Sequence, residues 1–318
     1  MEQNKEYNLH NSIEKVLLEN LKYQNKTRRW SNFFNFVKFF IFLIFISIFL
    51  SVLQTIQKPI SKTKDNKPHT ALIKIHGMIS EDSFLGSADN IIKSLRKAFK
   101  NENAKAILLD LNSPGGSPVQ SDLVFQEIMS LKKRYKDKKI YGVVADICAS
   151  GCYYIAAASD KIYANRASIV GSIGVLYNGF GFVNAMDKIG IERRLVTAGK
   201  NKAILDPFSP SNSKDIEILK TRLADIHQIF IKAVKLGRGN KLNSSKHDTL
   251  FSGLFWTGDE ALNLGIIDGF SSKLNVAEDI IKQKDIIDYT KSPGLLSTFT
   301  DKFGASVKEA VFDNIKIQ

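Results

Sequence analysis

The hydrophobic pattern begins with one long apolar run and continues as short apolar runs separated by amphipathic stretches. Residues 33–53 are almost wholly apolar, and the stretch Phe39–Leu50 contains no charged residue. A run of this length spans a bilayer as a helix of about twenty residues. We therefore predict a transmembrane signal anchor at residues 33–53, preceded by a tail at residues 1–32.

The charges beside the apolar run favour an N-terminus on the cytoplasmic side. A cleaved signal peptide fits less well, because the segment before the run is long and no Ala-x-Ala site follows it. Lysines lie on both sides of the run, but Arg28 and Arg29 stand close to its start, and positive residues are retained inside. The rest of the chain is then expected outside the cytoplasm.

A polar segment with prolines, residues 54–70, reads as a linker to the folded part. After it, short apolar runs alternate with helical patterns. The predicted strands are 71–75, 104–111, 139–145, 161–164 and 193–196. The predicted helices are 87–99, 119–135, 152–158 and 213–236, and Thr257 with Glu260 fits the capping box of another. This alternation predicts an α/β domain with one largely parallel sheet at residues 71–275, followed by a C-terminal extension at 276–318.

Composition excludes some classes of protein. With 318 residues and 44% hydrophobic content, the chain can bury a large core. The net charge of +13 comes from lysines scattered along the whole chain. Because no basic stripe interleaved with aromatic residues is present, we do not expect a nucleic-acid partner.

The chain has two cysteines, Cys148 and Cys152. Two cysteines make neither a disulfide framework nor a four-ligand zinc site. A thiol nucleophile is an alternative, but neither residue has an obvious histidine partner, and buried cysteines commonly act as small hydrophobic residues. Packing is the role expected of both.

One hydroxyl lies at a junction that suits catalysis. The apolar run 139–145 predicts a strand buried on both faces, and the alanine-rich run after Gly151 predicts a helix. Ser150 then lies beside amide groups that have no partner within the helix, where a hydroxyl can act as a nucleophile. The alternative is that Ser150 is an N-cap and Gly151 a turn residue.

A second loop suits the same chemistry. Ser113–Gly116 follows a predicted buried strand directly. Its two glycines, Gly115 and Gly116, allow close approach of the backbone to a ligand and suit an oxyanion hole, although a plain turn is the alternative.

A nucleophilic serine needs a base. The sequence holds five histidines, and none lies in a supporting local motif. A lysine can replace histidine when burial leaves its amine neutral. Lys202 stands directly before an apolar run, whereas Lys200 resembles a solvated turn residue.

Six features in order resemble the short form of the signal peptide peptidase A family, over roughly residues 71–269. Besides the apolar anchor, they are Ser113–Gly116, Ala149–Ala164, Gly171–Val175, Ala198–Lys202 and Phe255–Leu262. The resemblance implies a Clp-protease or crotonase-like fold of repeated ββα units. It also implies a serine endopeptidase in the bacterial inner membrane, with its catalytic domain on the periplasmic or extracytoplasmic side, that degrades apolar remnant signal peptides.

The resemblance also implies roles for single residues. Ser150 corresponds to the nucleophile, Lys202 to the general base and Ser172 to the hydroxyl that orients the lysine. Gly116, with Gly115, corresponds to the oxyanion-hole loop. Cys152 departs from the pattern, since glycine is expected there in many relatives, and its bulk could crowd the pocket or the helix start. No metal or cofactor is implied, and family members form homo-oligomeric rings in which active sites can be shared.

Two other functions remain open at this point. One is an acyl-CoA enzyme of the crotonase class, which shares the fold and the glycine-based oxyanion hole. The other is a non-catalytic membrane scaffold with the same fold. The anchor at 33–53 and the pairing of Ser150 with Lys202 argue against the acyl-CoA enzyme, and labelling of Ser150 by a fluorophosphonate would separate an enzyme from a scaffold.

Overall fold

The computed structural model describes residue 30, residues 32–49 and residues 66–291, and divides the chain into two units at residues 62 and 63. In the first unit the helix Asn32–Phe49 is long and apolar enough to cross a membrane, with a mean hydropathy of 2.0. This helix agrees in length and composition with the predicted anchor. Most of the predicted tail, and linker residues 54–65, lie outside the described residues.

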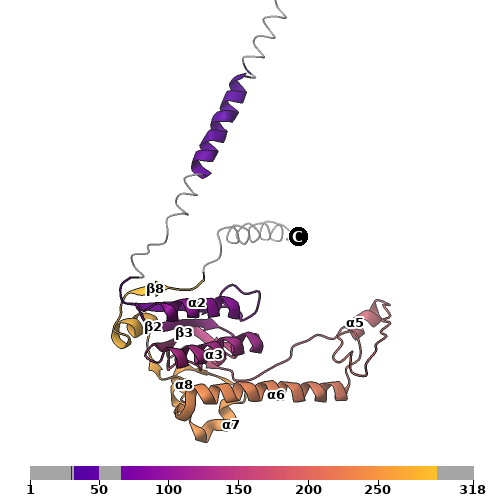
Figure 1. Cartoon of the computed structure of the whole chain (residues 1–318). Coiled ribbons are helices and arrows are strands. Elements are labelled where there is room, and N and C mark those ends of the chain that lie inside the picture. The colour runs from indigo at the N-terminus through magenta and orange to yellow at the C-terminus, as the bar shows by residue number, and fades with distance from the viewer. Residues whose placement is uncertain (1–29, 31, 50–65, 292–318) are drawn as a thin grey trace, which may run out of the picture. The chain divides into compact units, whose positions relative to one another are not determined.

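The second unit is built on a sheet of eight strands (Figure 1). The strands are β1 His69–His76, β2 Ala104–Ser113, β3 Lys139–Ala149, β4 Lys161–Ala164, β5 Ile169–Gly171, β6 Phe255–Thr257, β7 Gly269–Phe270 and β8 Ile286–Asp288. Their order is β6-β5-β3-β2-β1-β8, with β4 pairing β3 and β7 beside it. All pairs are parallel except β5 with β6. The predicted α/β fold with a largely parallel sheet is confirmed.

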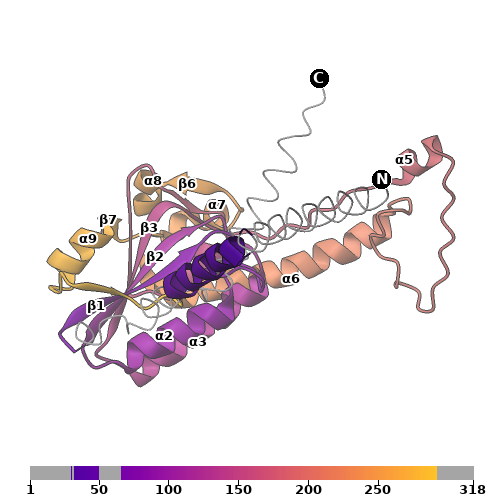
Figure 2. The ribbon, with the colours of Figure 1, turned by 90° about the horizontal axis from the view of Figure 1, so that it is seen from above.

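Helices cover the sheet unequally (Figure 2). They are α2 Ala88–Lys100, α3 Pro118–Arg134, α4 Gly151–Ala156, α5 Val183–Lys188, α6 Ser213–Arg238, α7 His247–Leu250, α8 Gly258–Asn263 and α9 Lys273–Asn275. Short turns of other helix types are Gly239–Lys241, Ser244–Lys246 and the π-helical Val276–Ile280. Apolar side chains of α2, α3 and α4 form the main core with alternate residues of the central strands. A smaller cluster around Leu108 and Val276 covers part of the other face.

The central strands are where the pattern predicted them, because long runs of β-branched and aliphatic residues suit strands that are buried on both faces. The capping box also forms: the Thr257 hydroxyl accepts from the Glu260 amide, and the Glu260 carboxylate accepts from the Thr257 amide. β8 joins the sheet beside β1, although it lies beyond residue 275. The short helix α4 ends at Ala156, two residues earlier than predicted.

The predicted strand at 193–196 is wrong. Those residues lie in an exposed segment between β5 and α6, residues 176–212, which we call the arm. Figure 1 shows the arm leaving the sheet and α6 returning toward it. A strand needs neighbouring backbone groups to pair with, and within the described residues 193–196 have none.

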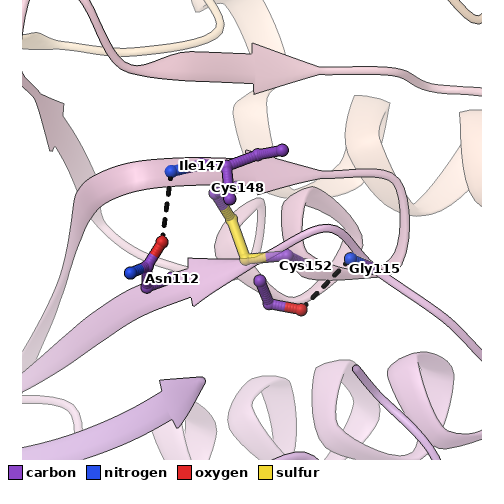
Figure 3. The surroundings of a disulfide bond; sticks show 6 residues. Asn112, Gly115, Ile147, Cys148 and Cys152 are labelled. Atoms are coloured by element: carbon purple, nitrogen blue, oxygen red, sulfur yellow. Dashed lines mark hydrogen bonds between the residues drawn. A yellow bond between two sulfur atoms is a disulfide. The ribbon is translucent and has the colours of Figure 1, made fainter. Parts of the chain in front are cut away.

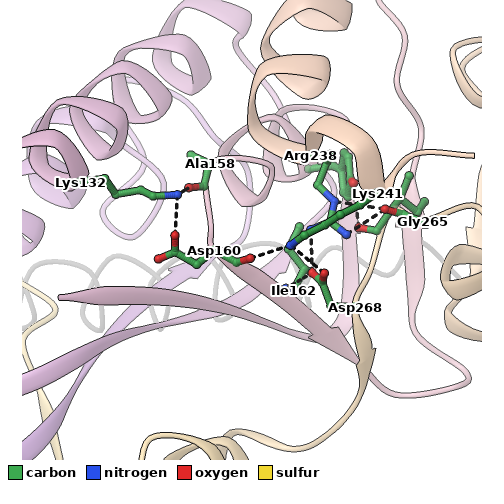
Figure 4. A network of polar contacts seen from close by, with 10 residues as sticks. Lys132, Ala158, Asp160, Ile162, Arg238, Lys241, Gly265 and Asp268 are labelled. Atoms are coloured by element: carbon green, nitrogen blue, oxygen red, sulfur yellow. Dashed lines mark hydrogen bonds and ion pairs between the residues drawn. The ribbon is translucent and has the colours of Figure 1, made fainter. Parts of the chain in front are cut away.

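A buried ion pair fastens the end of α6 to the sheet (Figure 4). Arg238, with a side chain that is 0% exposed, donates to the Asp268 carboxylate at 2.6 Å and to the Gly265 carbonyl oxygen. The same carboxylate accepts from the Ile162 amide at 2.7 Å and pairs with Lys241 at 2.8 Å. Burial alone would raise the pKa of Asp268, but the bonds from Arg238 and Lys241 together lower it.

Asp268→Asn is expected to destabilise the domain by about 3–5 kcal/mol, because it leaves the buried Arg238 guanidinium without its counter-charge. The folded-state pKa of Asp268 is lowered, so its stabilisation is present above the unfolded carboxyl pKa of about 4 and is lost as pH falls through the folded value. Wild type should therefore lose stability below about pH 4 more steeply than Asp268→Asn. Urea unfolding of the detergent-solubilised chain, followed by circular dichroism, measures both effects.

The matched control removes an exposed ion pair. The Lys93 Nζ and Asp89 Oδ2 atoms lie 2.5 Å apart with side chains 58% and 72% exposed, so Lys93→Gln should leave the unfolding midpoint close to that of wild type. Equal unfolding midpoints for wild type and Asp268→Asn would show that the buried pair does not fasten α6.

Candidate active site

Ser150 occupies a strained turn between β3 and α4. Its backbone has φ 53° and ψ −122°, a conformation that costs a residue with a side chain on the order of 1–3 kcal/mol. The turn is held from both sides, since the Ser150 amide donates to the Gly171 carbonyl oxygen at 2.8 Å and the Ser150 carbonyl oxygen accepts from Tyr154 at 3.0 Å. The predicted strand-to-helix position of Ser150 is confirmed.

The Ser150 hydroxyl does not cap the helix. Its side chain makes no capping hydrogen bond with the first turn of α4 and lines a cavity. Ser150 therefore stands at the N-cap position of α4 without capping the helix through its side chain, and its hydroxyl lines the cavity in which a bound molecule would lie.

The glycine loop lies directly against this turn. A Cβ on Gly115 would stand 2.7 Å from the Ala149 carbonyl oxygen and 2.8 Å from both the Gly151 nitrogen and the Ser150 Cβ. Gly116 has φ 149°, and a Cβ there would collide with the Ile79 carbonyl oxygen. The backbone reaches Ser150 because both residues lack a side chain.

The amides beside Ser150 differ in whether they already donate a hydrogen bond. The Gly115 amide donates to the Ser113 hydroxyl at 3.1 Å, so it is already used. Within the described residues, the amides of Gly116 and Gly151 have no hydrogen-bond partner, and both glycines line the cavity with Ser150. Gly116 and Gly151 thus offer the pair of donors that an oxyanion requires. Sequence reasoning named Gly116 but missed Gly151, which the unpartnered first amide of a helix could have indicated.

The cavity in front of Ser150 has a volume of about 940 Å³ and a largely apolar wall. Its apolar lining includes Met78, Val119, Leu123, Val175, Leu176, Ile226, Ile229 and Phe230. Several of these side chains are exposed, including Leu176 at 78% and Val119 at 66%. An apolar cavity with a few converging polar groups is typical of a binding site for an extended apolar molecule.

The cavity is also lined by Asp122, Tyr154 and Phe230, which contact one another. The Tyr154 hydroxyl donates to Asp122 at 2.8 Å, and its ring stacks on Phe230 with centroids 4.7 Å apart. Burial, together with the bond to Asp122, raises the pKa of Tyr154. Tyr154 therefore stays protonated at neutral pH and is not the base.

Ser172, which directly follows β5, and His227 of α6 also line the cavity. Ser172 has φ 52°, and its amide donates to the Leu254 carbonyl oxygen at 2.8 Å. His227 lines the same cavity, and its Nε2 donates to the Ile173 carbonyl oxygen at 3.0 Å. Because that nitrogen holds the Ser172 loop, it is not available to take a proton from Ser150.

Lys202 is not part of this cavity. It lies exposed in a turn of the arm, where its amide donates to the Gly199 carbonyl oxygen at 3.1 Å. The structure thus brings Ser150, Ser172 and the glycine loop around one cavity and leaves Lys202 outside it. Among the described residues, no group of three or more His, Cys, Asp or Glu side chains could hold a metal ion.

Cys148 and Cys152 form a disulfide across the Ser150 turn (Figure 3). Both residues are 0% exposed. The expectation that they only pack as thiols is wrong, because two buried sulfurs four residues apart in this tight turn lie within bonding reach. The pairing also removes the thiol-nucleophile alternative. Cys152 does not line the cavity, so it does not crowd the pocket.

Comparisons with known proteins give one family match and several relatives. Residues 132–286 match Peptidase family S49. A Brucella melitensis protein named "Na(+)/H(+) antiporter NhaA" is 49% identical over 57% of this chain and 24% of its own length. An Enterococcus faecium protein named "Putative signal peptide peptidase SppA" is 28% identical over 63% of this chain and 57% of its own. "Protease 4" of Haemophilus influenzae is 31% identical over 67% of this chain and 35% of its own.

The fold and the site define a class of α/β protein with a serine presented at a strand-to-helix turn beside free backbone amides. The matched region, which contains Ser150, Ser172 and Lys202, identifies the family within that class: the chain belongs to peptidase family S49. It spans less than two thirds of the length of each of these relatives.

Gly116→Ala is expected to slow labelling of Ser150 by a fluorophosphonate about 10²- to 10³-fold, because the added Cβ must push the Gly116 amide away from the reacting oxygen. Gly269→Ala is the control, since its Cβ would meet the Tyr163 ring at an ordinary 3.5 Å. The labelling rate of the full chain in detergent measures the effect. A rate equal to that of wild type would remove Gly116 from the oxyanion hole.

Proposed function

We propose that this chain is a membrane-anchored serine endopeptidase that cleaves apolar peptides, with remnant signal peptides as its substrate class. The observation that carries the proposal is the free Ser150 hydroxyl, which lines an apolar cavity together with two unpartnered amides. Membership of a peptidase family supports it. The name of the Enterococcus faecium relative supports the substrate class.

The proposed reaction is acyl transfer through Ser150. The Ser150 oxygen attacks the peptide carbonyl, and the amides of Gly116 and Gly151 stabilise the oxyanion that forms. Lys202 takes the hydroxyl proton and passes it to the leaving amine, while Ser172 orients the lysine. Water then hydrolyses the acyl-enzyme and frees Ser150.

The proposal requires Lys202 to reach Ser150, and a second copy of the chain is its best source. Lys202 lies outside the Ser150 cavity of its own copy, in an arm rich in exposed apolar side chains. These side chains include Phe180 at 77%, Ile189 at 69% and Val196 at 94% exposure. An apolar surface of this kind marks an interface between proteins. A homo-oligomer would bury the arm and bring a base to each serine.

We further propose that the catalytic domain faces the extracytoplasmic side of a bacterial inner membrane. The helix Asn32–Phe49 supplies an anchor of sufficient length. The Cys148–Cys152 disulfide favours an oxidising compartment, because cytoplasmic thiols are kept reduced.

The other functions fit less well. The antiporter name belongs to a relative of which this chain matches 24%, and the described residues hold one candidate membrane helix. An acyl-CoA enzyme would not need the Asn32–Phe49 helix, and a scaffold would not need the strained, uncapped Ser150. One experiment tests the peptidase against the acyl-CoA enzyme and the scaffold. Wild type should be labelled by a fluorophosphonate and should hydrolyse the peptide, and Ser150→Ala should do neither.

Ser150→Ala and Lys202→Ala are each expected to be inactive, but together they should regain activity when co-expressed. One copy then supplies the serine and its neighbour supplies the lysine. Random assembly pairs an intact serine with an intact lysine at about a quarter of the interfaces, so peptide hydrolysis near that fraction of the wild-type rate is expected. Co-expressed variants that stay inactive would place both groups within one copy, through movement of the arm.

Lys202→Arg is expected to abolish peptide hydrolysis, although it keeps the positive charge, because arginine cannot give up a proton at any working pH. Lys200→Arg, two residues away in the same arm, is the matched control and should cleave at close to the wild-type rate. Lys202 is not the base if Lys202→Arg keeps its activity, or if Lys200→Arg loses activity while Lys202→Arg does not.

A further inference from the structure

We propose that the Cys148–Cys152 disulfide is a positioning element that holds Ser150 in its reactive conformation and makes the activity depend on oxidation. The inference rests on the proposed peptidase function and concerns the same serine.

The disulfide joins two anchored points on either side of the nucleophile. Cys148 lies within the sheet, paired with Ser113 of β2 on one side and with Val170 of β5 on the other. Cys152 lies in the first turn of α4, fully buried in the main core. The bond therefore ties the end of the central strand to the start of the helix, with Ser150 midway between them.

The loop closed by the disulfide carries most of the site. It contains the nucleophile Ser150, the free amide of Gly151 and the carbonyl group of Ala149. These three residues are also the ones that a Cβ on Gly115 would touch, so the glycine loop rests on the closed loop. A change in the loop shifts the Ser150 hydroxyl relative to both the Gly116 and the Gly151 amides.

The Ser150 turn needs such a restraint because its backbone conformation is unfavourable. A serine with φ 53° relaxes toward negative φ unless its surroundings prevent it. Two hydrogen bonds, to Gly171 and from Tyr154, hold the turn besides the disulfide. Reduction takes up two electrons and two protons, breaks the S–S bond and leaves two thiols, so the Ser150 turn is then held by those two hydrogen bonds and by packing.

The proposed activity then depends on the compartment in which the domain lies. In a reducing cytoplasm the chain carries two thiols and a loosened Ser150 turn. In an oxidising compartment, exchange with a disulfide-containing oxidant takes up the two electrons and two protons of the thiols, forms the Cys148–Cys152 bond and fixes the nucleophile against its oxyanion donors. The peptidase is thereby weak during synthesis and reaches full activity on the side where its substrates are left.

The test uses the full chain in detergent and exploits its cysteine count. The sequence holds two cysteines, so a dithiol reductant can change no other disulfide within the chain. Dithiothreitol is expected to lower kcat for an apolar peptide about tenfold or more, with KM little changed, since a misplaced nucleophile affects the chemical step. Fluorophosphonate labelling should fall in parallel, and oxidised glutathione should restore both.

Cys148→Ala/Cys152→Ala is the matched control. It should show the low kcat of the reduced wild type and no response to dithiothreitol. Alkylation followed by mass measurement counts the free thiols in each sample. Where the buried bond resists dithiothreitol, protein made in a reducing cytoplasm and purified with reductant supplies the two-thiol form. Where the double variant does not fold, the two-thiol wild type carries the test.

The result that overturns the inference is a two-thiol wild type with the kcat of the oxidised form. A loss of kcat that merely follows a loss of circular dichroism signal would also overturn it, because the disulfide would then act on stability alone. Failure of the proposed function looks different: oxidised wild type and Ser150→Ala would hydrolyse the peptide at the same rate.

Discussion

The left-handed backbone of Ser150 is the constraint on which the site depends. The sheet fixes the end of β3 between β2 and β5, and the first turn of α4 begins at the next residue, so the chain must reverse direction at Ser150. That reversal turns the hydroxyl into the cavity and leaves the Gly151 amide unpaired. The same crowding requires glycine at positions 115 and 116, since any side chain there would meet the turn or the Ile79 backbone. The proposed nucleophile and the proposed oxyanion donors are thus products of one local conformation.

The parts of the fold that the sequence predicts are those fixed by local pattern. β2 and β3 are recognisable as apolar runs because both of their faces are largely buried. The capping box is recognisable because Thr257 and Glu260 are three positions apart. The segment at 193–196 was predicted as a strand from its sequence alone, but pairing depends on a neighbouring strand, and none lies beside it in the part of the chain that the structure describes. Arg238 and Asp268 are 30 positions apart, and no local rule connects them.

The residues of the site also divide into those that local sequence predicts and those that it does not. The hydroxyl and the glycine loop follow strands directly, so the topology of a parallel sheet predicts their meeting at its carboxyl edge. The disulfide was missed because buried cysteines near an alanine-rich helix also suit simple packing, and the sulfur positions depend on the sharpness of the Ser150 turn. The distance between Lys202 and Ser150 depends on the path of the arm between β5 and α6, which no residue pattern specifies.

Separation of the base from the nucleophile changes what controls the proposed enzyme. Within the described residues Lys202 lies outside the Ser150 cavity of its own copy, so in the proposed mechanism the hydroxyl of a single copy lacks its base. Assembly would bring the lysine, and oxidation would fix the serine. These two conditions act on different atoms, one on the proton acceptor and one on the backbone that carries the hydroxyl. Each alone leaves the reaction slow, so hydrolysis would be confined to copies that are both assembled and exported. For the proposed peptidase, whose apolar cavity suits extended hydrophobic segments, such a double requirement would protect the unfinished proteins of its own cytoplasm.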